Sequence, residues 1–289
     1  MPDRTIPEFT LGDYKLQMLC DGLFRLDGGA MFGIIPKVMW ERVKPCDEKN
    51  RIELSTNQML VRRNGKNILI EGGLGDKWDE KFIKIYGITR PMTIDNDLAQ
   101  IGLTPEDIDY IFLTHLHFDH CGSITKLDES GNYIPRYPNA KHFVHAQEWY
   151  DSHHPHLRNR ASYMNFNYDP VHEAGLFEIW DGTDGWVDLP EGISGHLIGG
   201  HTPGMAIYKL GNEDQSAIFL GDMAPTVQHL PSTWVLGYDL DPVRATYLKE
   251  DWFPIWMENK TLVCFAHDPD TPWCYITRNK KGQFDAEKL

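Results

Sequence analysis

Four side chains that can bind metal ions fall within six consecutive residues of the segment THLHFDH, residues 114–120. They are His115, His117, Asp119 and His120, and they follow directly after the apolar run IFL. The chain holds 13 histidines in 289 residues, so a chance match to H-x-H-x-D-H is expected on the order of two times in a thousand such sequences. Burying so many polar groups together is unfavourable unless each finds a partner, and a metal ion supplies those partners.

Imidazole nitrogens and carboxylate oxygens form a ligand set that suits zinc, and also manganese, iron and cobalt. Four side chains on one short turn cannot all converge on a single ion, because alternate residues point in different directions. We therefore expect His115 and His117 to bind one ion, and Asp119 and His120 to bind a neighbouring ion. Two ions held this close need further ligands from other parts of the chain.

Three more potential ligands lie at the ends of apolar stretches much further along the chain. His201 lies in LIGGHTPG, residues 197–204, where the glycines permit a tight turn that aims one side chain. Asp222 ends the run AIFLGD, and His267 ends LVCFAH. A histidine at the end of a strand is by itself more often structural, but together with the segment 114–120 we interpret these three as the missing ligands.

These motifs together resemble the metallo-β-lactamase superfamily of dinuclear hydrolases, and the resemblance extends from about residue 15 to 270. It implies an α+β fold of the αββα sandwich type, with two facing mixed β-sheets flanked by helices and the metals at one edge. It also implies a ligand assignment: His115, His117 and His201 at the first metal site, Asp119, His120 and His267 at the second, and Asp222 bridging the two ions.

The chemistry expected of such a pair of ions is hydrolysis. Two ions roughly 3.5–4 Å apart lower the pKa of a water between them and polarise an oxygen of the substrate. The predicted cofactors are two Zn²⁺ ions, with Mn²⁺, Fe²⁺ and Co²⁺ as alternatives. We expect the bridging hydroxide to attack a carbonyl or phosphoryl centre, while the catalytic residues Asp222 and Asp119 fix the bridge and help shuttle the proton.

The elements that must position these residues are indicated by hydrophobic patterning. Asn64-Gly65 between two β-rich runs over residues 57–73 predicts a hairpin, and the apolar stretches before the ligands are typical of buried strands. We predict a single domain over residues 1–289, made of two αβ halves at approximately 1–135 and 136–289. Further strands are expected within 14–33, 110–114, 140–153, 196–211, 216–223 and 261–268, and helices within 77–87, before the turn at 104–107, within 140–153 and within 241–260.

Composition limits the partners and the compartment. The net charge of −14, from 28 Lys and Arg against 42 Asp and Glu, repels phosphate backbones and argues against a nucleic-acid partner. The five cysteines are odd in number and form no C-x-x-C pair, which fits a reducing compartment. Since we find neither an apolar leader nor a stretch of membrane-spanning length, we expect a cytoplasmic protein without a membrane partner.

Two segments, 27–40 and 221–250, look most similar to the branch of acyl-homoserine lactonases and methyl-parathion hydrolases. This similarity implies opening of an N-acyl-homoserine lactone, which is quorum quenching, or cleavage of a related carboxylic ester. The alternatives are an organophosphate triester hydrolase and a glyoxalase II-like thioesterase, for which the basic segment 277–283 is a weak candidate for binding the anionic tripeptide. The small-molecule substrate is expected to contact Met31, Phe32, Ile35, His229 and Tyr238.

Several features leave alternatives open. Lactonases of this branch place a tyrosine three residues after the bridging aspartate, where this chain has Pro225, so that task falls to His229, to Tyr238 or to no residue. The apolar residues of 27–40 fit a substrate wall, a homodimer contact or plain core packing. The irregular segment 151–170 fits a lid or an exposed excursion. Glu71 stands where the superfamily usually has an aspartate before glycine, and fits either a support for the histidine loop or a surface turn.

Overall fold

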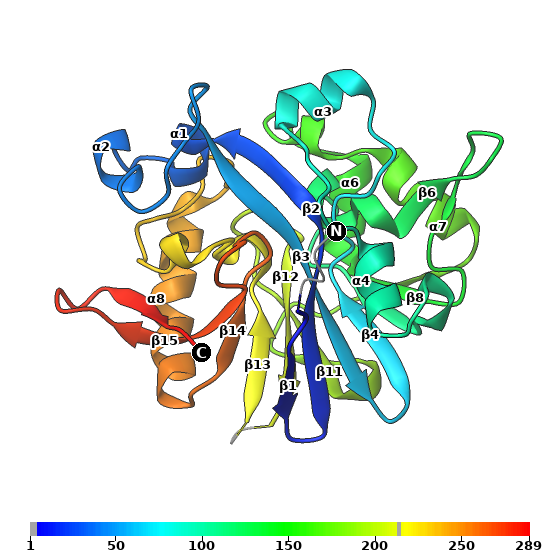
Figure 1. The fold of residues 1–289 in the computed structure, drawn as a ribbon. Helices are drawn as coiled ribbons and strands as arrows, with labels where there is room; N and C mark the ends of the chain where they lie inside the picture. Colours follow the sequence, from blue (N-terminus) through cyan, green and yellow to red (C-terminus); the bar gives the residue numbers. More distant parts are fainter. Residues whose placement is uncertain (1–4, 213–214) are drawn as a thin grey trace.

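The computed structural model describes residues 5–212 and 215–289. In this part of the chain, two seven-stranded mixed sheets face each other in the middle of the molecule and helices flank them (Figure 1). This confirms the αββα sandwich predicted from the sequence. The first sheet contains β1 (Glu8–Leu11), β2 (Tyr14–Asp27), β3 (Arg51–Arg63), β4 (Lys66–Ile70), β5 (Tyr110–Phe112), β8 (Lys141–His145) and β9 (Phe177–Trp180), in that order.

The second sheet is built entirely from the C-terminal part of the chain. Its strands also lie in sequence order: β10 (Val187–Asp188), β11 (Ile193–Leu197), β12 (Ala206–Gly211), β13 (Ser216–Phe219), β14 (Leu262–Cys264), β15 (Trp273–Arg278) and β16 (Phe284–Glu287). The chain leaves the first sheet after Trp180, whereas the predicted boundary between halves at 135–136 lies between β5 and β8, two strands of that sheet. A separate two-stranded ribbon joins β6 (Thr125–Leu127) to β7 (Tyr133–Pro135).

The main core lies between the two sheets, where alternate side chains of both are buried against each other. Met59 and Phe112 of the first sheet belong to the same buried cluster as Tyr208 and Phe219 of the second. Because burial of each such side chain contributes about 1.5–3 kcal/mol, this layer fixes the two sheets face to face. The strand ends of both sheets are thereby held at one common edge.

Helices lie on the flanks of the sandwich and along the edge where the predicted ligands gather (Figure 1). They are α1 (Gly28–Phe32), α2 (Lys37–Trp40), α3 (Glu80–Tyr86), α4 (Ile94–Gln100), α5 (Phe118–Cys121), α6 (Ala146–His153), α7 (Asp169–Glu173) and α8 (Pro242–Glu258). The α4 residues Ile94 and Leu98 pack on the first sheet, and the α8 residues Phe253 and Trp256 pack on the second. Figure 1 shows α4 and α6 on one flank and α8 on the other.

Local sequence signals explain several of these boundaries. Asn64 and Gly65 both have positive φ, 51° and 76°, as the two-residue turn between β3 and β4 requires. The Asp27 carboxylate accepts from the backbone N–H of Ala30 and so begins α1. The loop expected after the first strand is therefore helical at 28–32 and again at 37–40. No helix within residues 5–212 and 215–289 has both the length and the apolar character needed to cross a bilayer.

Candidate metal centre

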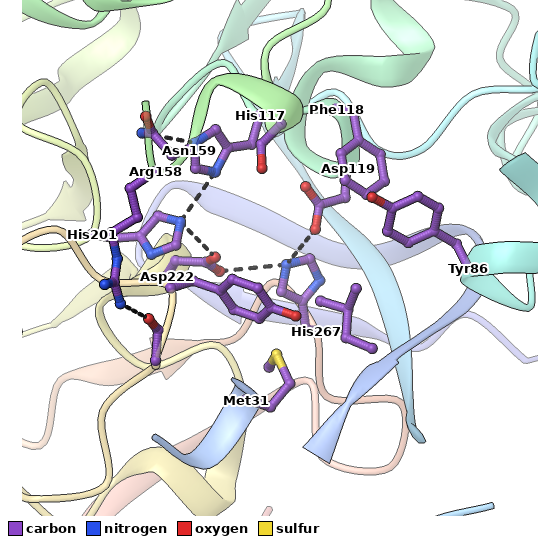
Figure 2. Close-up of a pocket in the computed structure, with 14 residues that line it drawn as sticks. Met31, Tyr86, His117, Phe118, Asp119, Arg158, Asn159, His201, Asp222 and His267 are labelled. Carbon is purple, nitrogen blue, oxygen red and sulfur yellow. Dashed lines mark hydrogen bonds and ion pairs between the residues drawn. The ribbon is translucent and has the colours of Figure 1, made fainter. Parts of the chain in front are cut away.

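Three histidines converge at the first predicted site. The Nε2 atom of His115 lies 3.2 Å from Nδ1 of His117, which lies 3.1 Å from Nε2 of His201. His115 and His117 follow β5, and His201 lies in the turn between β11 and β12, so both sheets contribute. Figure 2 shows His117 and His201 turning their rings toward each other.

A second trio lies beside the first. The Nε2 atoms of His120 and His267 are 3.0 Å apart, and Oδ2 of Asp119 lies 3.5 Å from the His267 nitrogen and 4.0 Å from the His120 nitrogen. Asp119 and His120 belong to α5, whereas His267 follows β14. The sequence-based division of the ligands into two groups therefore matches the positions of the side chains.

Asp222 lies between the two trios with one carboxylate oxygen toward each. Its Oδ1 is 3.4 Å from Nε2 of both His120 and His267, and its Oδ2 is 3.3 Å from Nε2 of His201. Asp222 follows β13, whose carboxyl end lies beside that of β14 because the two strands are parallel. This is the arrangement that a bridging carboxylate requires.

The protonation states of His115, His117 and Asp222 fit divalent cations, whereas the carboxylates around His120 and His201 outweigh burial and raise the pKa of both rings, so a cation must displace a proton there. Burial, together with the neighbouring histidines, holds the pKa of His115 and of His117 well below the ordinary value, so both rings are neutral. Burial would raise the pKa of Asp222, but His120, His201 and His267 outweigh it and lower that pKa well below its usual range. Neutral imidazole and ionised carboxylate are the forms that bind metals.

Hydrogen bonding leaves the same atoms without other partners. Oδ1 of Asp222 is buried and accepts no hydrogen bond from the described residues. The facing ring nitrogens cannot all be satisfied by one another, because a neutral imidazole has a single N–H. Cations between the two trios would satisfy all of these atoms together.

Two ligand rings are held from behind by a hydrogen-bond acceptor on their other nitrogen, and a carboxylate faces that nitrogen in a third. Nδ1 of His201 lies 2.9 Å from Oδ1 of Asp239, and Nδ1 of His267 lies 2.8 Å from the carbonyl oxygen of Ser55. Nδ1 of His120 lies 3.3 Å from Oε2 of Glu71. An acceptor at Nδ1 places the hydrogen there and leaves Nε2 bare toward the centre.

Glu71 therefore supports the histidine loop and is not a surface turn residue. Its side chain is 2% exposed, and its Oε1 accepts from the hydroxyl and the backbone N–H of Thr114, immediately before the first ligand. The residue adopts a φ of +81°, which is strained for a side chain with a Cβ. The surrounding contacts hold it in this conformation.

Glu148 is a support that the sequence reasoning missed. Its buried carboxylate accepts from the backbone N–H of Leu116 at 2.8 Å, from the hydroxyl of Thr202 at 2.6 Å and from that of Tyr163 at 2.9 Å. It thus joins the loop carrying His115 and His117 to the loop carrying His201. Its sequence context, a helix after a strand, gave no signal of this role, and the same is true of Asp239.

The glycines around His201 act as predicted. Gly199 and Gly200 have φ values of +67° and +90°, which glycine adopts without strain. A Cβ on Gly204 would lie 2.2 Å from the backbone nitrogen of Glu148, so only glycine lets helix α6 approach this turn.

A cavity of about 230 Å³ opens over the metal centre. Of the predicted substrate residues, Met31 and Tyr238 line it, while Phe32, Ile35 and His229 do not. Five of the seven predicted ligands reach its wall, namely His117, Asp119, His201, Asp222 and His267. The remaining wall residues are Leu26, Tyr86, Phe118, Arg158, Asn159, Ser162 and Gly237.

The segment 27–40 and His229 need a correction for this reason. His229 is fully buried, with Nε2 2.9 Å from the carbonyl oxygen of Met31 and its ring stacked on Phe32 at 4.8 Å. Phe32 in turn stacks on Trp40, so these two rings are packed core behind the cavity wall, whereas Val38 and Met39 of the same segment are exposed. Ile34 is 85% exposed, and the homodimer contact stays a prediction.

The irregular segment 151–170 contributes the opposite wall. Arg158 and Asn159 line the cavity from this segment, on the side of His117 and His201, whereas Tyr86 and Phe118 lie beyond Asp119 (Figure 2). Of the two interpretations of this segment, the structure favours a part in the binding site.

Comparison with known proteins identifies the family. The model of the metallo-beta-lactamase superfamily matches residues 51–267, three quarters of the chain, and the protein belongs to this superfamily. Its His/Asp clusters are groups that could hold metal ions.

Among solved structures, a probable metal-dependent hydrolase from Staphylococcus aureus is 29% identical, with a TM-score of 0.85 over 97% of this chain and 99% of that one. The dizinc quorum-quenching lactonase AidC has the same fold, at 19% identity and a TM-score of 0.77 over 98% and 97% of the two chains.

Similarity to curated relatives is more limited. The N-acyl homoserine lactonase AttM of Rhizobium radiobacter is 26% identical over 184 residues, 61% of this chain and 64% of the relative. The metallo-hydrolase mfmC of Annulohypoxylon moriforme is 22% identical over 112 residues, 35% of this chain and 29% of the relative. The chain thus spans less than two thirds of the length of either.

Proposed function

We propose that this protein is a dinuclear hydrolase that opens a lactone, such as an N-acyl-homoserine lactone, or cleaves a related carboxylic ester. The observation that carries the proposal is the position of Asp222, with one carboxylate oxygen toward each trio of ligands. The similarity to AttM and the fold shared with AidC support the choice of a lactone.

In this proposal His115, His117 and His201 hold one divalent ion, and Asp119, His120 and His267 hold the other. When bound, two such ions polarise a substrate oxygen and lower the pKa of water so that it is a nucleophile near neutral pH. We propose zinc for both. Asp119 lies in the cavity wall, where its carboxylate can receive the proton that the attacking water loses.

Tyr238 is the proposed donor to the substrate carbonyl. Pro225 occupies the position of the lactonase tyrosine, and its carbonyl oxygen instead accepts from the backbone N–H of His267. Tyr238 lines the cavity beside the ligands, and burial raises the pKa of its hydroxyl above the ordinary value. It therefore remains protonated at neutral pH and can donate to a developing oxyanion.

The thioesterase alternative has less support. The basic segment 277–283 contributes Arg278 and Lys281 to a separate surface hollow beside Glu250 and Phe284, and none of its residues lines the metal cavity. The geometry of the metal site does not distinguish triester hydrolysis from lactone opening, because both reactions need the same two-ion site. A substrate assay distinguishes them.

The test is a substrate panel with the purified protein loaded with zinc or manganese. It comprises homoserine lactones of different acyl length, aryl esters, a paraoxon-like triester and S-lactoylglutathione. We expect lactones or carboxylic esters to give the highest kcat/KM. A higher kcat/KM for the triester or for the thioester would refute the proposal.

A further inference from the structure

The two walls of the cavity differ in chemistry. Tyr86 and Phe118 form an aromatic wall on the side of Asp119, Met31 adds apolar surface near His267, and Arg158 and Asn159 lie on the side of His117. Arg158 is the one permanently cationic side chain of the lining, all of which lies in the described part of the chain. A substrate in this cavity therefore meets a positive charge at one end only.

Arg158 has spare hydrogen-bonding capacity. One terminal nitrogen of its guanidinium donates to the carbonyl oxygen of Gly237, and no carboxylate of the described residues forms an ion pair with it. A guanidinium has five N–H donors, so several remain for a ligand. Acidic residues outnumber basic ones in this chain, whose net charge is −14, yet this cationic side chain has no carboxylate partner among the described residues.

Asn159 adds a second donor, because the position of the ring hydrogen of His117 decides which way the Asn159 amide is oriented. Nδ1 of His117 faces the other ligand nitrogens, so its Nε2 must carry the hydrogen and needs an acceptor. The Asn159 amide lies 3.5 Å from that Nε2. We therefore assign the amide oxygen to that contact, since the oxygen and nitrogen of an amide have nearly the same shape.

This assignment leaves the amide NH₂ of Asn159 without a partner. With this assignment the NH₂ occupies the second amide position, which meets no hydrogen-bonding group in the described residues. Asn159 is only 7% exposed, so solvent reaches this group little. An unsatisfied buried donor is unfavourable, and a ligand oxygen would relieve it. Arg158 and Asn159 are thus adjacent donors in the same wall.

We propose that Arg158 and Asn159 form a subsite for an anionic substituent, most simply a carboxylate, on the ester or lactone that the enzyme cleaves. The inference rests on the proposed function and narrows its substrate class. It places the charged end of the substrate on the side of His117 and its apolar end against Tyr86 and Phe118. An N-acyl-homoserine lactone lacks such a carboxylate, so acidic esters and lactones are the favoured members of the class.

The test compares two esters that differ in charge but little in shape, 4-carboxyphenyl acetate and 4-carbamoylphenyl acetate. We expect Arg158→Gln to lower kcat/KM for the carboxylate ester about tenfold, mainly through KM, as loss of one charge-assisted hydrogen bond implies. The neutral ester should change less than about twofold. Because each variant is compared with the wild type, the difference in leaving group cancels.

The matched control is Arg160→Gln, which removes the same charge two residues away from a side chain outside the cavity lining. It should alter neither ester. Arg158→Lys keeps a cation and a donor for Gly237 and should lie between wild type and Arg158→Gln. Equal losses for both esters would mean that Arg158 only fastens its loop to Gly237, and would overturn the inference.

A binding measurement separates this inference from the proposed function. In calorimetry, Arg158→Gln should bind 4-hydroxybenzoate about tenfold more weakly than the wild type does. The neutral 4-hydroxybenzamide should bind both proteins with the same affinity. If the wild type hydrolyses neither ester while this difference persists, the proposed function fails and the anion subsite stands. If both esters are hydrolysed and the charge preference is unchanged in Arg158→Gln, the subsite fails alone.

Discussion

Replacing Glu71 with glutamine should empty the second metal site while leaving the first. Oε1 of Glu71 accepts from Thr114, and its Oε2 faces Nδ1 of His120 at 3.3 Å. A glutamine has the same shape, but one of the two atoms becomes NH₂. If the oxygen stays with Thr114, the NH₂ faces His120 and forces the ring to carry its hydrogen on Nε2. A protonated Nε2 cannot bind an ion.

The magnitude follows from the burial of both partners. Their side chains are 1% and 2% exposed, so solvent screens the interaction little. At 3.3 Å the contact is an ion pair, so its contribution is at most that of a charge-assisted hydrogen bond, about 1.5–3 kcal/mol, and about 1.4 kcal/mol corresponds to tenfold. Metal affinity at the second site should therefore fall by about 10-fold to 100-fold, the range found when supports of metal ligands are removed.

Chelator competition with elemental analysis measures this directly. At a chelator concentration where the wild type keeps two ions per chain, Glu71→Gln should keep one. Asp239→Asn is the matched variant, because Asp239 orients His201 in the same way at the first site, and it should lose the other ion. Two ions bound by Glu71→Gln with wild-type affinity would refute the role of Glu71 in setting the tautomer.

Four further outcomes are expected. Asp222→Ala should reduce both the metal content and the hydrolysis rate, and an unchanged rate would rule out a bridging role. Tyr238→Phe should lower kcat by about 10²-fold with normal metal content, which steady-state kinetics with the preferred ester can check. Burial lowers the pKa of His142 to about 3, so its imidazole binds a proton more tightly in the unfolded chain than in the folded one. The free energy of unfolding should therefore decrease as the pH drops below about 6.5, by about 2 kcal/mol at pH 5. Urea unfolding at pH 7 and pH 5 should show a smaller decrease for His142→Phe than for the wild type, and equal decreases would contradict this. Gly204→Ala should destabilise the fold by about 1–3 kcal/mol because its Cβ would meet the backbone of Glu148, and an unaltered urea midpoint would show that the turn can adjust.

The convergence of the proposed ligands could be predicted because their signals are local. His115 to His120 lie on one turn after a buried strand, and Asp222 and His267 end neighbouring parallel strands, so residue type and strand position together indicate their convergence. The hairpin turn at Asn64 and the tight turn beside His201 could likewise be predicted, because both need positive φ angles that asparagine and glycine adopt readily.

Residues whose roles depend on distant packing could not be predicted in this way. The Nδ1 partner of His201, Asp239, lies 38 positions away, and His229 is held by the carbonyl oxygen of Met31, 198 positions away. Apolar patterning in 27–40 did not indicate which side chain would face the cavity, and of the two neighbours Met31 lines it while Phe32 does not. Arg158 carried no signal at all, because an arginine in an irregular segment is usually solvated.

If the proposed ions bind, the division of each trio between the two sheets links the stability of the protein to its metal supply. His115, His117, Asp119 and His120 lie in the segment after β5 of the first sheet, and His201, Asp222 and His267 follow strands of the second, so each complete ligand set needs both sheets in place. Ions that bind only the assembled molecule favour it by mass action, by about 2.7 kcal/mol per ion at a free concentration one hundred times the dissociation constant. Metal starvation should then shorten the lifetime of the chain by opening it to proteolysis, and the cell would lose protein as well as activity.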